Sequence, residues 1–227
     1  MAEEEPVFET TTGPPRIITA ASLFDGHDAA INVMRRLIQS AGAEVIHLGH
    51  DQSAKAVVDC AIQEDAHGVA LTSYQGGHVE YFTYIRQLLD EAGCKHIRIF
   101  GGGGGTITPP EIKTLHESGI SKIYSPDDGR TMGLMGMIHH LMGIASEVDL
   151  IHPDRIASLS GPVTPEDTAK VGLLLTMSES ADDKTFKSTL EKCRSSEKEV
   201  PVIGFTGTGG AGKSSLLDEL MLRILRD

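Results

Sequence analysis

Short apolar runs rich in β-branched residues alternate with longer, helically periodic segments over the first two thirds of the chain. The runs predict five strands, at 16–24, 44–48, 68–72, 96–100 and 121–124. The periodic segments predict five helices, at 28–41, 53–64, 79–92, 109–118 and 131–144. This alternation is typical of a parallel sheet covered on both faces. We therefore expect an α/β, flavodoxin-like, doubly wound sheet of strand order 2-1-3-4-5 over residues 16–148.

The alternation stops after residue 148. Residues 149–198 are polar, with one helical pattern near 165–178 but no clear core, and we expect a linker with helical pieces. An apolar run then predicts a strand at 200–205 and a helix at 214–226, so residues 199–227 are expected to begin a second domain. Residues 1–15 are acidic and rich in Thr and Pro, which predicts a disordered lead-in rather than a signal peptide.

Composition and charge exclude several classes of protein. Hydrophobic residues make up 40% and charged residues 23% of the 227, as in an ordinary globular protein. The net charge of −12 argues against nucleic acid and anionic membranes as general partners. No apolar run approaches the roughly 20 residues of a membrane span. Three scattered cysteines fit neither a disulfide framework nor a zinc site, which favours a cytoplasmic protein.

Three loops are expected at the carboxyl edge of the sheet, where ligands bind in such folds. The first carries Asp25-Gly26-His27, the second runs from Ser73 to His78, and the third holds the five glycines Gly101–Gly105. An aspartate two residues before a histidine can accept one imidazole N–H while the other nitrogen binds a metal. Consecutive glycines remove every β-carbon where a flat, bulky ligand lies against backbone.

The segment Asp25-Gly26-His27-Asp28-Ala29-Ala30 resembles the Asp-x-His-x-x-Gly motif of cobalamin-binding domains of the base-off, His-on type. Ser73 and the glycine run resemble the family's second and third motifs. The resemblance implies that His27 is the lower axial ligand of cobalt, supported by Asp25, in adenosyl- or methylcobalamin. The chain departs from the family at Ala30, where Gly is usual, and at Gln75, where Leu is usual. The implied cofactor-binding residues are Asp25, His27, Ala30, Ser73, Gln75, Gly102 and Gly103.

A competing interpretation of the same residues is a response-regulator-like or other flavodoxin-like domain in which the histidine is incidental. The aspartate, the serine and the glycine run in register favour cobalamin. His78 lies on a rim loop, and whether it lines the ligand site stays open. The other histidines and the methionines of the last expected helix are interpreted as surface or packing residues.

A second motif spans Gly207 to Ser214 and fits G-x-x-x-x-G-K-[ST], between an apolar run and a helical pattern. Its N–H groups would cradle phosphates, Lys213 would reach the β/γ oxygens, and Ser214 would hold magnesium. Only about 28 residues of such a domain are in the chain, so we expect no nucleotide hydrolysis. The expected GTP contacts are Gly207, Gly209, Gly210, Ala211, Gly212, Lys213, Ser214 and Ser215.

Together the two motifs resemble the fused isobutyryl-CoA mutase family, which joins a cobalamin domain, a GTPase domain and an acyl-CoA barrel. The resemblance implies an adenosylcobalamin-dependent isomerase of isobutyryl-CoA and n-butyryl-CoA. The GTPase and barrel domains would be missing partners, the whole protein a homodimer, and this chain inactive alone. A second hypothesis is a stand-alone corrinoid carrier or small mutase subunit. A third is a nucleotide-switched signalling protein without a corrin.

Overall fold

The computed structural model describes residues 6–164, 166–194 and 201–226. They fall into two compact units, one ending at Ser195 and the other beginning at Ser196. The first unit holds the sheet and α1–α8, and the second holds α9, Lys213–Ile224.

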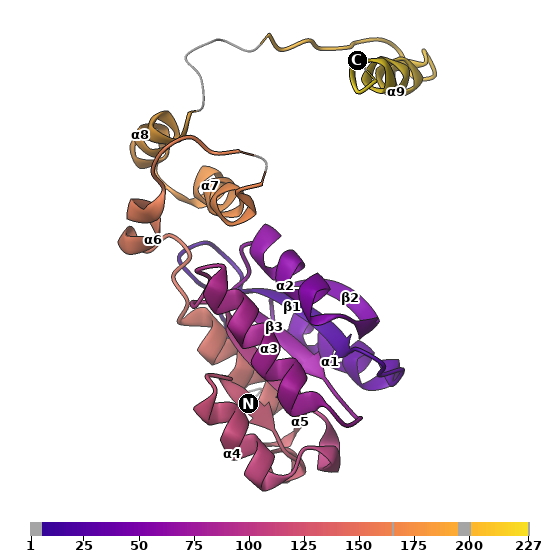
Figure 1. Ribbon diagram of the computed structural model, residues 1–227, viewed down its shortest axis with the longest axis vertical. Coiled ribbons are helices and arrows are strands. Elements are labelled where there is room, and N and C mark those ends of the chain that lie inside the picture. The colour runs from indigo at the N-terminus through magenta and orange to yellow at the C-terminus, as the bar shows by residue number, and fades with distance from the viewer. Residues whose placement is uncertain (1–5, 165, 195–200, 227) are drawn as a thin grey trace, which may run out of the picture. The chain divides into compact units, whose positions relative to one another are not determined.

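The first unit contains the expected five-stranded parallel sheet, in the order β2-β1-β3-β4-β5. Figure 1 labels β1, β2 and β3 of this sheet. The doubly wound fold and its strand order are therefore confirmed. The strands are β1 Arg16–Ser22, β2 Glu44–Gln52, β3 Gly68–Thr72, β4 Arg98–Gly102 and β5 Lys122–Tyr124. The helices that follow them are α1 Asp28–Ser40, α2 Ala54–Gln63, α3 His78–Glu91, α4 Pro109–Glu117 and α5 Pro126–Ser146, with the 3₁₀ turn Gly104–Thr106 before α4.

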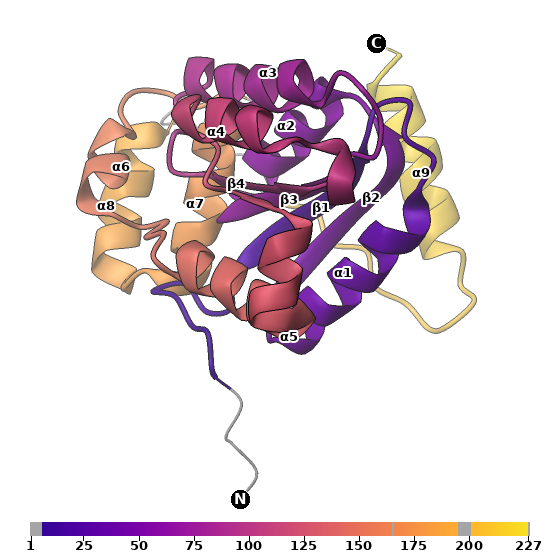
Figure 2. The same ribbon diagram turned by 90° about the horizontal axis from the view of Figure 1, so that it is seen from below.

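The helices cover both faces of the sheet, as Figure 2 shows with α2, α3 and α4 on one side and α1 and α5 on the other. Side chains such as Val57, Phe82 and Leu115 form the core of the first face. Ile38 and Met142 belong to the core of the second. Because β1, β3 and β4 are buried on both faces, their apolar runs are nearly continuous.

Two elements differ from their predicted bounds in ways that matter for the rim of the sheet. β2 continues beyond residue 48 to Gln52, because a bulge shifts its register so that Thr19 pairs with His47 and Ala20 with Gly49. The longer strand carries Asp51 to the carboxyl edge. α5 begins earlier than predicted and is interrupted at Gly133, whose φ of 68° and ψ of 173° are not helical.

Residues 149–194 contain a small core that the polar pattern did not reveal. The helices are α6 Pro153–Ser158, α7 Thr168–Ser180 and α8 Asp183–Cys193. The buried residues of this core are Leu159, Leu173, Met177 and Cys193. α7 lies against the end of α2, where a β-carbon on Gly172 would come within 2.9 Å of the Ile62 carbonyl oxygen. Arg155 of α6 also pairs with the buried Asp65 at 2.7 Å. The absence of a core was therefore wrongly predicted, while the boundaries of the linker stay a prediction.

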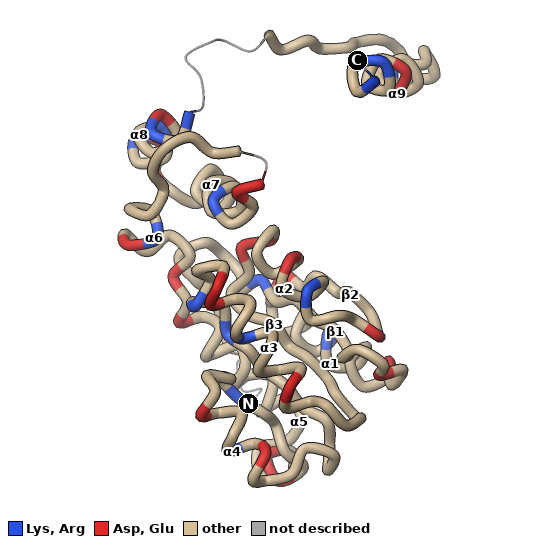
Figure 3. Tube along the Cα trace, in the orientation of Figure 1, with Lys and Arg blue, Asp and Glu red and all other residues tan. Residues whose placement is uncertain are grey.

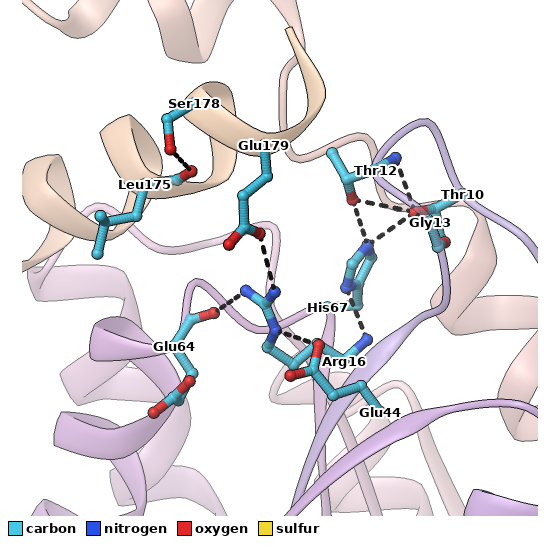
Figure 4. Close-up of polar contacts among 10 residues, drawn as sticks. All are labelled: Thr10, Thr12, Gly13, Arg16, Glu44, Glu64, His67, Leu175, Ser178 and Glu179. Carbon is cyan, nitrogen blue, oxygen red and sulfur yellow. Dashed lines mark hydrogen bonds and ion pairs between the residues drawn. The ribbon is translucent and has the colours of Figure 1, made fainter. Parts of the chain in front are cut away.

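The described part of the lead-in, residues 6–15, is attached to the first unit. Phe8 packs against the core under α1 and α5, and Thr11 donates a hydrogen bond of 2.7 Å to Asp149. The hydroxyls of Thr10 and Thr12 lie 3.2 and 3.4 Å from Nε2 of His67 (Figure 4). These contacts correct the expectation of disorder for this stretch, and residues 1–5 lie outside the described residues.

The second unit consists, where described, of an extended segment, a glycine loop and α9. Residues 201–205 do not form the expected strand, and Val202 is 96% exposed. A strand needs a neighbour to satisfy its backbone, and none pairs with it among the described residues. None of the helices in the described ranges combines the length and the apolar character that a bilayer crossing needs. Figure 3 shows basic and acidic residues interspersed over the helices.

Candidate functional site

The loop between β1 and α1 holds a histidine at the carboxyl edge of the sheet. His27 is the N-cap residue of α1, and its side chain is 72% exposed. Nδ1 lies 2.8 Å from Oδ1 of Asp25, whose side chain is fully buried. This contact takes up Nδ1 and leaves Nε2 as the nitrogen that a metal could bind.

The buried Asp25 carboxylate is held by three donors. Oδ1 accepts the His27 N–H at 2.9 Å as well as the imidazole, and Oδ2 accepts the Tyr74 N–H at 2.6 Å. Burial alone would raise the pKa of the carboxyl group, but these N–H donors and the imidazole outweigh it and hold the pKa below its ordinary value. The aspartate is therefore ionised at neutral pH and orients the ring.

A cavity of about 260 Å³ lies between the carboxyl ends of β3 and β4 and the helices α1 and α5. Tyr74 connects it to the histidine, because Tyr74 lines the cavity and its ring centroid lies 5.6 Å from that of His27. Three of the expected cofactor residues, Ala30, Gly102 and Gly103, line the same cavity. Its other walls are mainly apolar, from residues that include Ile31, Met34, Phe100, Tyr124, Ile138 and Leu141.

The glycine run is sterically required at particular positions. A β-carbon on Gly103 would lie 1.9 Å from the Ser73 carbonyl oxygen, and one on Gly101 would lie 2.4 Å from Cζ of Phe82. A β-carbon on Gly105 would meet nothing within 4 Å. The close approach of the β3 and β4 loops thus explains why a glycine is needed at position 103, which lines the cavity.

A threonine, in addition to the expected residues, belongs to the cavity wall. Thr72 lines the cavity, and within the described residues its buried Oγ1 has no hydrogen-bond partner. Ser73 is also buried, but its Oγ accepts a hydrogen bond of 2.8 Å from Ser22. Strand alternation could have found Thr72, because it shares the α1 and α5 face with Ala70. Tyr74 was also missed, since no polar spacing singles it out.

Two further rim residues are used for internal contacts. The Gln75 amide donates to the Leu23 carbonyl oxygen, so it holds the β1–α1 loop. His78 is absent from the described residues that line the cavity. Its Nδ1 lies 3.0 Å from the Gln75 carbonyl oxygen, and its Nε2 lies 3.3 Å from Oε2 of Glu111, without hydrogen-bond geometry. The cofactor contact expected of Gln75 stays a prediction.

In the second unit the expected phosphate loop precedes α9 directly. Gly210 and Gly212 have φ angles of 77° and 78°, which favour glycine. Nζ of Lys213, the first residue of α9, donates to the carbonyl oxygens of Gly207 and Thr208 at 2.9 and 2.8 Å. The loop-to-helix geometry agrees with the motif, and nucleotide binding stays a prediction. The remaining residues of the motif are Gly209, Ala211, Ser214 and Ser215.

Comparison with known proteins places this geometry in context. A family model for the B12 binding domain matches residues 15–123. The chain is 49% identical over 219 residues, 93% of its length, to the fused isobutyryl-CoA mutase of Geobacillus kaustophilus. It is 51% identical over 214 residues to the fused isobutyryl-CoA mutase of Cupriavidus metallidurans. These matches cover 20% and 19% of the two relatives, so the chain spans about a fifth of their length.

A shorter relative matches half of this chain. The 2-hydroxyisobutanoyl-CoA mutase small subunit of Aquincola tertiaricarbonis is 34% identical over 115 residues. The match takes in 50% of this chain and 82% of that subunit. Half of this chain therefore corresponds to most of a separate subunit.

Proposed function

The chain belongs to the B12-binding domain family, and on this premise we propose that it is the cofactor-binding part of an adenosylcobalamin-dependent acyl-CoA mutase. In this proposal Nε2 of His27 binds cobalt as the lower axial ligand. The nucleotide tail of the cofactor enters the cavity between the strand ends and helices α1 and α5. The observation that carries the proposal is the exposed imidazole whose Nδ1 is held by a buried carboxylate, beside that cavity.

The residues present fit such a cofactor. The mainly apolar cavity wall includes Thr72, whose buried hydroxyl has no hydrogen-bond partner within the described residues and in this proposal is available to a ligand. Gly103 leaves the β4 loop without a β-carbon where the loops crowd. Cobalamin brings four corrin nitrogens of its own, so a single protein nitrogen completes the lower face of the metal.

Each residue has a defined part in the proposal. Asp25 accepts the Nδ1 proton of His27, which fixes the tautomer and makes Nε2 a better ligand. Tyr74 donates its backbone N–H to that carboxylate and forms part of the cavity wall. When bound, adenosylcobalamin supplies radical chemistry for carbon-skeleton rearrangement. The residues of this chain position the cofactor and shield its lower side.

The match to fused relatives takes in 93% of this chain and so extends beyond residues 15–123 of the B12-binding domain, which favours the fused arrangement. We therefore propose that Lys213, Ser214 and the glycines before them bind GTP and magnesium in a complete GTPase domain. Isomerisation of isobutyryl-CoA and n-butyryl-CoA, homodimerisation, and the lack of turnover by this chain alone belong to the same proposal.

Spectroscopy of the purified chain tests the cobalt ligand. Titration with adenosylcobalamin should give the base-off, His-on absorbance change. In protein labelled with ¹⁵N-histidine, the cob(II)alamin form should show superhyperfine splitting from one axial ¹⁵N, which distinguishes histidine from the ¹⁴N base of the cofactor itself, and this splitting should disappear when His27 is replaced by alanine. Persistence of the ¹⁵N splitting in His27→Ala, or its absence from the labelled wild type, would overturn the assignment. A mutase assay of the loaded chain with isobutyryl-CoA should detect no product.

A second candidate is a carrier that presents cobalamin to a separate mutase subunit. It is supported by the match to 82% of a small subunit. Truncation after residue 148 separates the two candidates. A carrier should keep full cobalamin affinity and serve a separate large subunit. A fused mutase requires the downstream sequence for any isomerisation.

A further inference from the structure

The loop that carries His27 is braced from a neighbouring loop by an acidic residue that the site described above does not include. Oδ1 of Asp51 accepts the N–H of Phe24 at 2.6 Å. The N–H of Asp51 in turn donates to the carbonyl oxygen of Asp25 at 3.3 Å. Asp51 of β2 thus makes hydrogen bonds to the backbone on both sides of the peptide bond that joins Phe24 to Asp25.

The backbone at this brace has an unusual conformation. Phe24 and Asp51 have φ angles of 64° and 56°, in the left-handed region that residues other than glycine seldom adopt. Asparagine and aspartate tolerate this region better than other residues do, whereas phenylalanine does not. The Phe24 ring is 80% exposed, so side-chain packing contributes little to holding the residue there. The contact from Asp51 therefore stabilises a turn that the loop alone would not favour.

The turn determines where the metal-binding side chain lies. Reversal of the chain at Phe24 directs the Asp25 side chain into the protein, where it is fully buried and meets the Tyr74 N–H. From there the carboxylate holds both the backbone N–H and Nδ1 of His27. Gln75 holds the opposite side of the loop through the Leu23 carbonyl oxygen. Hydrogen bonds from β2 and from the loop after β3 thus hold residues 23–27 from two sides.

We propose that Asp51 is a positioning residue for the cobalt ligand: it holds the β1–α1 loop in the binding geometry before cobalamin arrives. This proposal rests on the assignment of His27 as the ligand. Preorganisation of the loop removes an ordering step from binding, so it raises affinity without a contact between Asp51 and the cofactor. Two register shifts in the pairing of β2 with β1, one between Thr19 and Ala20 and one between Ala20 and Ser22, carry Asp51 to this position.

Three substitutions at one position separate the hydrogen bond from the backbone conformation. Asp51→Asn keeps an acceptor oxygen and a residue that tolerates positive φ. Asp51→Gly keeps the positive φ but removes the acceptor. Asp51→Ala removes the acceptor and adds strain. The complete 227-residue chain is used for each, with thermal unfolding as a check that the fold is unchanged.

Two measurements are made on each variant. Amide hydrogen exchange of the cofactor-free protein, read on a peptide covering residues 22–28, should be faster in Asp51→Gly than in the wild type. Adenosylcobalamin affinity of Asp51→Gly, from absorbance titration, should fall about three- to ten-fold, the factor expected for loss of one hydrogen bond. Asp51→Asn should restore both values to near the wild type, and Asp51→Ala should be weakest.

Wild-type affinity in Asp51→Gly would overturn the positioning role, as would equal losses in Asp51→Asn and Asp51→Gly. A different outcome tests the cobalt ligand itself. If the cob(II)alamin form of wild-type protein labelled with ¹⁵N-histidine shows no splitting from an axial ¹⁵N, the assignment of His27 fails, whatever the Asp51 variants do to hydrogen exchange.

Discussion

At the carboxyl end of the sheet, His27 has one nitrogen bound to a buried aspartate and a ring that is 72% exposed. At the amino end, His67 is 1% exposed, and both of its nitrogens have partners (Figure 4). Its Nδ1 accepts the Arg16 N–H at 2.9 Å, so Nε2 carries the proton that faces the hydroxyls of Thr10 and Thr12. Burial, followed by the nearby Arg16, lowers the pKa of His67 to about 4.

The difference shows which histidine the sheet uses for structure and which it offers to a ligand. Both ring nitrogens of His67 have partners in the protein, so the ring connects the lead-in, β1 and the loop before β3. Neither nitrogen is available to bind a metal. The hydrogen bond at Nδ1 of His27 orients the imidazole ring and leaves Nε2 available as a metal ligand. The same residue type therefore stabilises the fold at one end and, in the proposed function, binds the cofactor at the other.

Alanine at each histidine should separate the two roles, with the largest expected effect at the amino end. His67→Ala removes a buried ring and leaves the Arg16 N–H without its acceptor, so it should lower the free energy of unfolding by about 3 kcal/mol. His27→Ala should change it by less than about 0.5 kcal/mol but abolish the axial nitrogen signal. Urea unfolding and cobalamin titration measure both. Equal losses of stability would contradict the comparison.

The crowding of the cavity loops can be tested within the glycine run. Gly103→Ala forces a β-carbon against the Ser73 carbonyl oxygen and should destabilise the protein by about 2 kcal/mol, with weaker cobalamin binding. Gly105→Ala, where the added carbon meets nothing within 4 Å, is the matched control and should stay within about 0.5 kcal/mol. Denaturant unfolding measures the free energy of unfolding of both variants. Similar values for the two would show that the β3 and β4 loops can move apart at little cost, and would contradict the prediction.

A fall in pH should lower the free energy of unfolding through protonation of His67 at the amino end of the sheet. Its pKa of about 4 in the folded protein lies below the ordinary value of 6.5, so the unfolded chain binds the proton more readily. This contribution to stability is complete above pH 6.5 and is lost as the pH falls toward 4, by about 2 kcal/mol between pH 7 and pH 5. In His67→Gln that part of the pH dependence should disappear. Unfolding free energies across this range that are parallel in the two proteins would refute the prediction.

The smallest expected effect distinguishes two buried hydroxyls that have no hydrogen-bond partner among the described residues, Thr72 at the cavity and Thr176 in α7. Replacing either by valine should leave stability unchanged or raise it by about 1 kcal/mol, because an unsatisfied hydroxyl is removed. Only Thr72→Val should weaken adenosylcobalamin binding, by about three- to ten-fold. An equal loss of affinity in Thr176→Val would show that the effect is not specific to the cavity.

Much of the first unit could be predicted from the sequence, because its determinants are local. The alternation of apolar runs and helical segments specifies strands, helices and parallel topology. Asp25 and His27 are two residues apart, so their contact needs only one turn of the loop. The expected placement of Ala30, Gly102 and Gly103 around one ligand site agrees with the cavity, because the carboxyl ends of the strands meet at one edge.

Contacts between elements distant in the sequence could not be predicted. Asp51 reaches the β1–α1 loop only because of a bulge, and nothing in the local pattern of β2 marks it. Thr72 lies in the cavity wall and its hydroxyl has no partner among the described residues, whereas Ser73 accepts a hydrogen bond from Ser22, a difference that follows from strand alternation at the end of β3. The core around Met177 depends on helices that each carry few apolar residues and bury them only together.

The sequence by itself thus determined the sheet, the aspartate–histidine pair and the glycine loops, since each depends on spacing along the chain. The tertiary structure alone decided which polar groups remain available. Whether a histidine such as His67 or His27 is satisfied or open depends on donors and acceptors brought together from separate elements. Hydrogen-bond satisfaction is a property of the assembled fold, and it is this property that distinguishes the end of the sheet where we propose that the cofactor binds from the opposite end.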